Sequence, residues 1–98
     1  MYIKVMQLVN DKNNPAANQI VLVIGETIHF VSYGTLIAKY EIRTQKLTLS
    51  KDWEYSKTTR KHLYIFLRDY TRHPVYNITD VRNNIKNKVF KVKETLNY

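Results

Sequence analysis

A basic segment between residues 57 and 72 carries the side chains whose types and spacing best suit a binding surface. Projected as a helix, it places six of them within a sector of about 120°: Lys57, Arg60, Lys61, Tyr64, Arg68 and Arg72. Cations at helical spacing can contact successive phosphates, and a tyrosine among them can stack on a base. The pattern lacks a base-reading signature, so it predicts nucleic-acid binding through phosphate contacts with little sequence preference.

The cations are concentrated in the second part of the chain. Residues 57–93 contain ten Lys or Arg against two Asp or Glu, whereas residues 1–56 contain six against five. We expect five further cations to extend the basic face: Arg82, Lys86, Lys88, Lys91 and Lys93. Segregated charge favours a polyanionic partner, either DNA or RNA, or an acidic protein. Any one of these residues, taken alone, is better interpreted as a solvent-exposed side chain without a binding role.

The sequence does not suggest catalysis or a metal. His29, His62 and His73 have no ligand-pair spacing, and the chain has no cysteine. Neither a serine in a glycine-flanked elbow nor a carboxylate pair beside a histidine or lysine occurs. We therefore expect a protein that is not an enzyme and holds no cofactor. No apolar run approaches the roughly 18 residues of a membrane span, and the absence of cysteine favours a reducing compartment, so we expect a cytoplasmic protein without a membrane partner.

The first half of the chain reads as a meander of antiparallel strands. Alternating apolar residues predict strands over residues 2–9, 27–33, 36–42 and 47–49. The uninterrupted apolar run over residues 19–24 predicts a strand buried on both faces, followed by a tight turn at Gly25-Glu26.

The pattern changes to helical spacing after Trp53. An amphipathic helix is predicted over residues 57–72, capped by Ser56, stopped before Pro74, and buried through Thr59, Leu63, Phe66, Leu67 and Tyr70. A short helix over residues 79–87, with Ile78 packed before its start, and a final strand over residues 89–96 complete the chain. The prediction is one α+β domain, residues 1–98, with an antiparallel sheet of four to six strands.

Three blocks of sequence carry a resemblance to a known group of proteins. They are Ser32-Tyr33-Gly34-Thr35-Leu36-Ile37-Ala38-Lys39, then Lys46-Leu47-Thr48-Leu49, then a Trp-x-Tyr-Ser-x-Thr-Thr-x-Lys run from Trp53 to Lys61, closed by Phe66-Leu67. They resemble a small uncharacterised domain family common in phages, plasmids and other mobile elements of Gram-positive bacteria. The chain departs from the family at Asp52, where an aromatic residue is expected, and in a longer connection over residues 68–77. The resemblance implies a phage or mobile-element accessory protein acting in the bacterial host, and no established activity.

The Tyr55–Thr59 run has two interpretations. Its hydroxyls can cap the helix, or its hydroxyls and free amides can bind an anion such as phosphate, favoured by Lys57, Arg60 and Lys61. For the whole protein, nucleic-acid binding is the leading hypothesis. The alternatives are a phage inhibitor, for anti-defence or host takeover, that binds a host protein such as a nucleic-acid-handling immune effector, and self-association, for instance as a dimer, through an exposed β edge.

Overall fold

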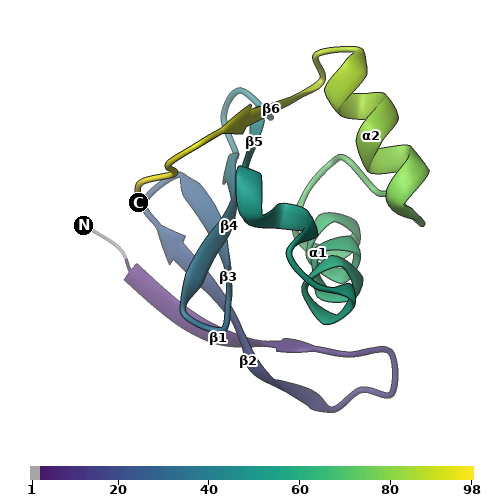
Figure 1. Ribbon diagram of the computed structural model, residues 1–98. Helices are drawn as coiled ribbons and strands as arrows, with labels where there is room; N and C mark the ends of the chain where they lie inside the picture. Colours follow the sequence, from purple (N-terminus) through teal and green to yellow (C-terminus); the bar gives the residue numbers. More distant parts are fainter. Residues whose placement is uncertain (1–2) are drawn as a thin grey trace.

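The computed structural model describes residues 3–98 and contains a six-stranded sheet in the order β1 to β6, with helices on one face (Figure 1). The strands are β1 (Ile3–Val9), β2 (Pro15–Ile24), β3 (Thr27–Ser32), β4 (Thr35–Glu41), β5 (Leu47–Ser50) and β6 (Phe90–Lys93). The helices are the 3-10 helix η1 (Lys51–Glu54), α1 (Lys57–Tyr70) and α2 (Ile78–Lys86). The predicted α+β class, the number of strands and the order of elements are confirmed.

Short turns connect the first five strands, and each pairs antiparallel with the next. The turn between β2 and β3 falls at Gly25, whose φ of 58° suits glycine. Strand β6 returns only after three helices, and this crossover brings it alongside β5 in parallel, with Leu47 opposite Phe90. The sequence predicted a final strand over residues 89–96; it is shorter, and its parallel pairing was not foreseen.

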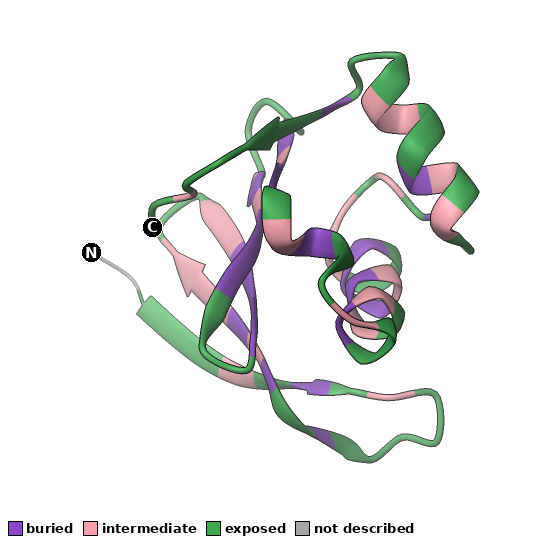
Figure 2. Ribbon diagram, in the orientation of Figure 1, coloured by how far each residue is buried: buried purple, intermediate pink, exposed green. Residues whose placement is uncertain are grey.

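Strand β2 differs from its prediction in two respects. It begins at Pro15 rather than at residue 19, because Pro15 pairs with Val9 at the end of the β1–β2 hairpin. It lies between β1 and β3, but it is not buried on both faces: Ile20 and Leu22 remain partly exposed. The helices cover only one face of the sheet, so part of the other face stays open to solvent (Figure 2).

Helix α1 packs its apolar stripe against the inner face of the sheet. The ring of Phe66 is fully buried and stacks on Phe30 of β3 at 5.5 Å and on Tyr70 at 5.7 Å between centroids. The predicted buried set is confirmed for Thr59, Leu63, Phe66 and Leu67, with Tyr70 partly buried. The helix ends at Tyr70 rather than at Arg72, since Thr71 adopts an extended conformation.

The start of α1 is capped as the sequence predicts. Ser56 is extended, and its Oγ accepts the Thr59 backbone N–H at 3.0 Å. Helix α2 instead starts one residue earlier than predicted: Asn77 caps it through Asp80 N, and Ile78 is its first helical residue rather than a residue packed before it. The Asn77 amide oxygen accepts this N–H at 2.9 Å and so caps the helix.

Replacing Ser56 with alanine should lower the free energy of unfolding by about 1 kcal/mol, because the Thr59 amide loses its acceptor. Ser56→Asn is the matched control, since asparagine caps helices as well as serine does. Urea denaturation of both variants measures the difference. A Ser56→Ala protein as stable as the wild type would show that the cap is not needed.

His29 lies on the outer face of the sheet, the face away from α1, because its neighbour Phe30 points toward the helix. Its side chain is fully buried, its ring lies 5.4 Å from that of Tyr98, and within residues 3–98 neither ring nitrogen has a hydrogen-bond partner. Burial lowers the pKa of His29 below its ordinary value of 6.5 against the opposing effect of the Leu22 backbone, and the charge of neighbouring Lys39 lowers it further. The folded protein therefore favours neutral His29.

The free energy of unfolding should fall as the pH drops below 6.5, because the unfolded chain then binds a proton at His29 that the folded chain binds only at lower pH. Above that pH the residue is neutral in both states and contributes no pH dependence. Urea denaturation between about pH 7.5 and about pH 5.5 tests this against His29→Gln, which removes the titrating group. Identical pH slopes for the two proteins would contradict the prediction.

Candidate nucleic-acid interface

The first half of α1 presents the most open cations of the predicted face. Lys57 and Lys61 are exposed, and neither forms an ion pair within residues 3–98. Arg60 is half-buried and donates from Nη1 to the backbone oxygen of Glu54 at 3.3 Å. These positions remain available to an anion.

The middle of the predicted face is only partly open. Tyr64 is half-buried, and burial raises the pKa of its hydroxyl against the opposing effect of neighbouring Arg60. Ile65 is buried although it projects toward the same side of α1, since Val75 and Tyr76 line a common hollow with Tyr64 and Ile65. The connection between the two helices thus covers part of the surface that the sequence predicts to be free for stacking.

The other predicted cations of this region are paired or displaced. Arg68 contacts Asp69 and Asp11, each at 2.9 Å, and its hydrogen bonds to Asp69 and then to Asp11 raise its pKa. Arg82 pairs with Glu54 at 3.4 Å. Arg72 is exposed but follows the end of α1, so it does not continue the helical face. These pairings reduce the positive charge that the helix offers to a polyanion.

A second group of cations gathers on the outer face of the sheet. Lys39, Thr48 and Lys91 lie in one row across β4, β5 and β6. A hollow of about 420 Å³ is lined by four lysines, which we call the outer-face lysine cluster: Lys39, Lys46, Lys91 and Lys93.

The outer-face lysine cluster has little opposing charge. Glu41 is the one acidic side chain among the described residues that line the hollow, and it accepts a hydrogen bond from Thr44 at 3.0 Å. Lys39 donates to the backbone oxygen of Asn97 at 3.4 Å, and no lysine of the cluster forms an ion pair within residues 3–98. The hollow is therefore strongly positive.

The structure separates Lys91 and Lys93 from the α1 cations that the sequence predicts them to extend. Phe90 is buried toward the helices, with its ring 5.4 Å from that of His73. Strand alternation then directs Lys91 and Lys93 to the opposite side of the sheet. Lys86 at the end of α2 and Lys88 in the following turn are exposed between the two groups. The predicted continuous face is therefore two surfaces, one at the start of α1 and one on the sheet.

Sequence reasoning missed Lys39 and Lys46 because they lie in the half of the chain with nearly balanced charge. A signal was present for Lys39: alternation over residues 36–42 places it on the face opposite Tyr40. Only the pairing of Lys39 with Thr48, and of Thr48 with Lys91, shows that it adjoins the C-terminal lysines.

The part of the chain that the structure describes holds neither a metal-binding cluster nor a membrane-spanning helix. Across residues 3–98, no three His, Cys, Asp or Glu side chains lie close enough together to hold a metal ion. In the same part of the chain, no helix has the length and apolar character needed to cross a membrane.

Comparison with known proteins gives one match. No curated protein and no solved structure is significantly similar to the chain. A family profile covers nearly the whole sequence, from residue 3 to residue 92. The chain therefore belongs to DUF8033, a family of unknown function.

Proposed function

We propose that this protein binds nucleic acid without catalysing a reaction, mainly through phosphate contacts at the outer-face lysine cluster, with Lys57 and Lys61 as a second contact. The observation that carries the proposal is the hollow lined by four lysines and a single acidic side chain. A strand that occupied it would neutralise like charges that otherwise repel one another.

The chemistry of the cluster favours a sequence-tolerant contact. Lysine ammonium groups are compact point charges that do not provide the planar, bidentate geometry with which arginine reads guanine. Each phosphate that they neutralise releases condensed counterions, so affinity should depend steeply on salt. The net charge of +8 would also accelerate encounter with a polyanion.

The resemblance to domains of mobile elements supports a role as an accessory protein of a Gram-positive phage or related element, acting in the cytoplasm of the bacterial host. A second candidate function is inhibition of a host protein, with this protein bound to an acidic surface of that host protein. It is favoured by a hollow of about 430 Å³ beside the edge strand β6, where Ile85, Phe90 and Val92 provide an apolar floor among lysines. Such a contact would bury apolar surface and depend less on salt.

Fluorescence anisotropy with labelled single- and double-stranded oligonucleotides, at low and at physiological salt, tests the proposal. We expect micromolar or tighter binding at low salt that weakens steeply as salt rises. No binding at low salt would overturn the proposal and favour the inhibitor, and binding insensitive to salt would contradict the phosphate-dominated contact.

A further inference from the structure

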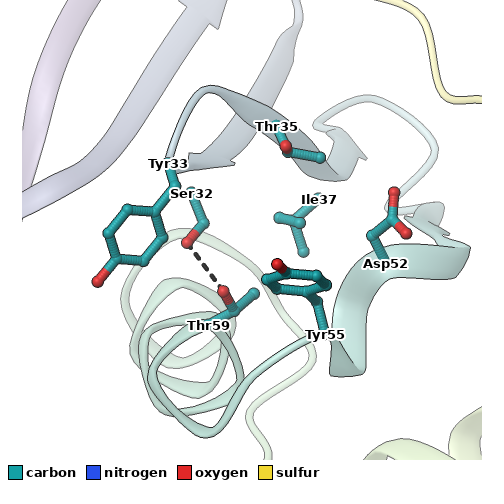
Figure 3. A pocket seen from close by; sticks show the side chains of 7 residues that line it. All are labelled: Ser32, Tyr33, Thr35, Ile37, Asp52, Tyr55 and Thr59. Atoms are coloured by element: carbon teal, nitrogen blue, oxygen red, sulfur yellow. Dashed lines mark hydrogen bonds between the residues drawn. The ribbon is translucent and has the colours of Figure 1, made fainter.

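A pocket of about 300 Å³ opens between the β3–β4 turn, η1 and the first turn of α1 (Figure 3). Ile37 forms part of its lining, together with Tyr33 from the β3–β4 turn and Tyr55 from the segment between η1 and α1. Its volume lies at the lower end of the range for small-molecule sites. The pocket brings together two of the sequence blocks that carry the family resemblance, the one that begins at Ser32 and the one that begins at Trp53.

Hydroxyl groups at the pocket form a chain that leaves one proton unused. Ser56 Oγ accepts the Thr59 amide proton and donates to Thr59 Oγ1 at 3.1 Å. Thr59 Oγ1 lies 3.1 Å from Ser32 Oγ, and one of these two hydroxyls donates to the other. The pair holds two protons and this contact uses one, so within residues 3–98 the other has no acceptor.

Both hydroxyls belong to residues that line the pocket, so the unused proton lies at the pocket wall in either arrangement. Each residue is only 2% exposed, so little of either hydroxyl is open to solvent. A buried donor without a partner costs free energy, and a chain of hydroxyls that begins at a helix amide polarises its last member as a donor. The pocket therefore offers a hydrogen bond to an acceptor on a ligand.

Asp52 supplies hydrogen-bond acceptors to the pocket. Its carboxylate is half-buried, and Oδ2 accepts a long hydrogen bond of 3.4 Å from Ser50. In the described part of the chain no side chain or amide donates to Oδ1. An ionised carboxylate can accept several hydrogen bonds, so Asp52 can receive donors from a ligand.

Aromatic rings complete the site. Tyr55 is 82% exposed, and Figure 3 shows its ring nearly edge-on, with Ile37 above its face and Thr59 beside it. Tyr33 is 56% exposed, and its φ of 50° follows from its place beside Gly34, whose φ is 78°, in the two-residue β3–β4 turn. A flat ring bearing both donors and acceptors fits this combination.

We propose that the pocket receives one unstacked base of a single-stranded nucleic acid, stacked on Tyr55, and that guanine fits it best. The N1–H and N2–H groups of guanine would donate to Asp52, and a guanine acceptor would receive the proton of the Ser32–Thr59 pair. Thymine and uracil have no exocyclic amine to offer Asp52.

This inference rests on the proposed function, because the base must belong to a bound strand. The register of the sheet supports the connection: Lys93 pairs with Ser50, whose hydroxyl contacts Asp52. Lys93 of the outer-face lysine cluster and Asp52 of the pocket are thus linked through Ser50 at the end of β5. Exposed Lys51 and Lys57, each within two residues of a lining residue, can contact phosphates on either side of the base.

Anisotropy with two single-stranded oligonucleotides tests the preference, one all thymidine and one with a single central guanosine. We expect the guanosine to tighten binding about tenfold, as one good bidentate contact does. Asp52→Asn should remove this preference and keep the affinity for the thymidine strand, whereas the matched control Glu26→Gln, an exposed site in the β2–β3 turn, should keep the preference. Equal affinities of the wild-type protein for both strands would overturn the base assignment.

Free guanosine separates failure of the pocket from failure of the proposed function. We expect it to shift the amide resonances of Thr35, Tyr55 and Thr59 in the wild-type protein and not in Asp52→Asn. Oligonucleotide binding without these guanosine shifts would overturn the pocket and leave the phosphate contact standing. Guanosine shifts without oligonucleotide binding would overturn the proposed function and retain the pocket as a site for a free base.

Discussion

Replacing Lys91 and Lys93 together with glutamate should weaken oligonucleotide binding on the order of 100-fold at low salt. Both side chains line the hollow of the outer-face lysine cluster, and both are exposed on an edge strand, where the fold tolerates charge. Loss of about two phosphate contacts should also reduce the slope of log affinity against log salt by about 2. Anisotropy titrations over a range of salt measure both effects.

Two matched variants with the same change in charge show where the contact lies. Lys4 and Lys12, exposed on β1 and in the turn after it, form the control pair. Their replacement by glutamate should weaken binding only about fivefold, through the lower net charge. Lys57 and Lys61 test the surface at the start of α1, where we expect an intermediate loss. A loss for Lys91 and Lys93 no larger than for the control pair would contradict the assignment of the cluster.

Phe66→Ala should lower the free energy of unfolding by about 3–5 kcal/mol. The ring is fully buried between Phe30 and Tyr70, so its removal loses transfer energy and leaves a cavity in the layer between α1 and the sheet. Urea denaturation measures the change. Phe66→Leu, which retains most of the apolar volume, should cost much less.

An exposed aromatic residue provides the control for this prediction. Tyr76 is 77% exposed, and Tyr76→Ala should change the free energy of unfolding by less than about 0.5 kcal/mol. A loss well below 1 kcal/mol for Phe66→Ala would mean that α1 does not pack through this ring.

Local patterns accounted for most of the fold. The buried stripe of α1 follows a period that the sequence displays, and Ser56 is a capping residue directly before it, so the start of the helix was predictable. The parallel pairing of β6 was not predictable, because it depends on where the chain lies after the three helices that precede this strand. The exposure of Ile20 and Leu22 was also missed, since a local apolar run does not show that one face of the sheet lacks a covering layer.

The candidate site was harder to predict because its residues meet through long-range contacts. The sequence places Arg68 among free cations, but in the fold it donates a hydrogen bond to Asp11, which lies 57 positions away in the sequence. Lys39 and Lys91 belong to one surface only through β5, which pairs with both neighbouring strands. The Tyr55–Thr59 run was recognised as a motif, but the partner of Thr59, Ser32, could not be identified without the packing of α1 on β3.

An NMR titration of the labelled protein with a short single-stranded oligonucleotide shows whether a nucleic-acid strand lies on the outer-face lysine cluster. We expect the largest amide shifts at Thr48, Lys91 and Lys93 and weaker shifts at Lys57 and Lys61, all reversed by added salt. An absence of shifts at low salt, or shifts confined to surfaces outside both groups of lysines, would contradict binding at the cluster.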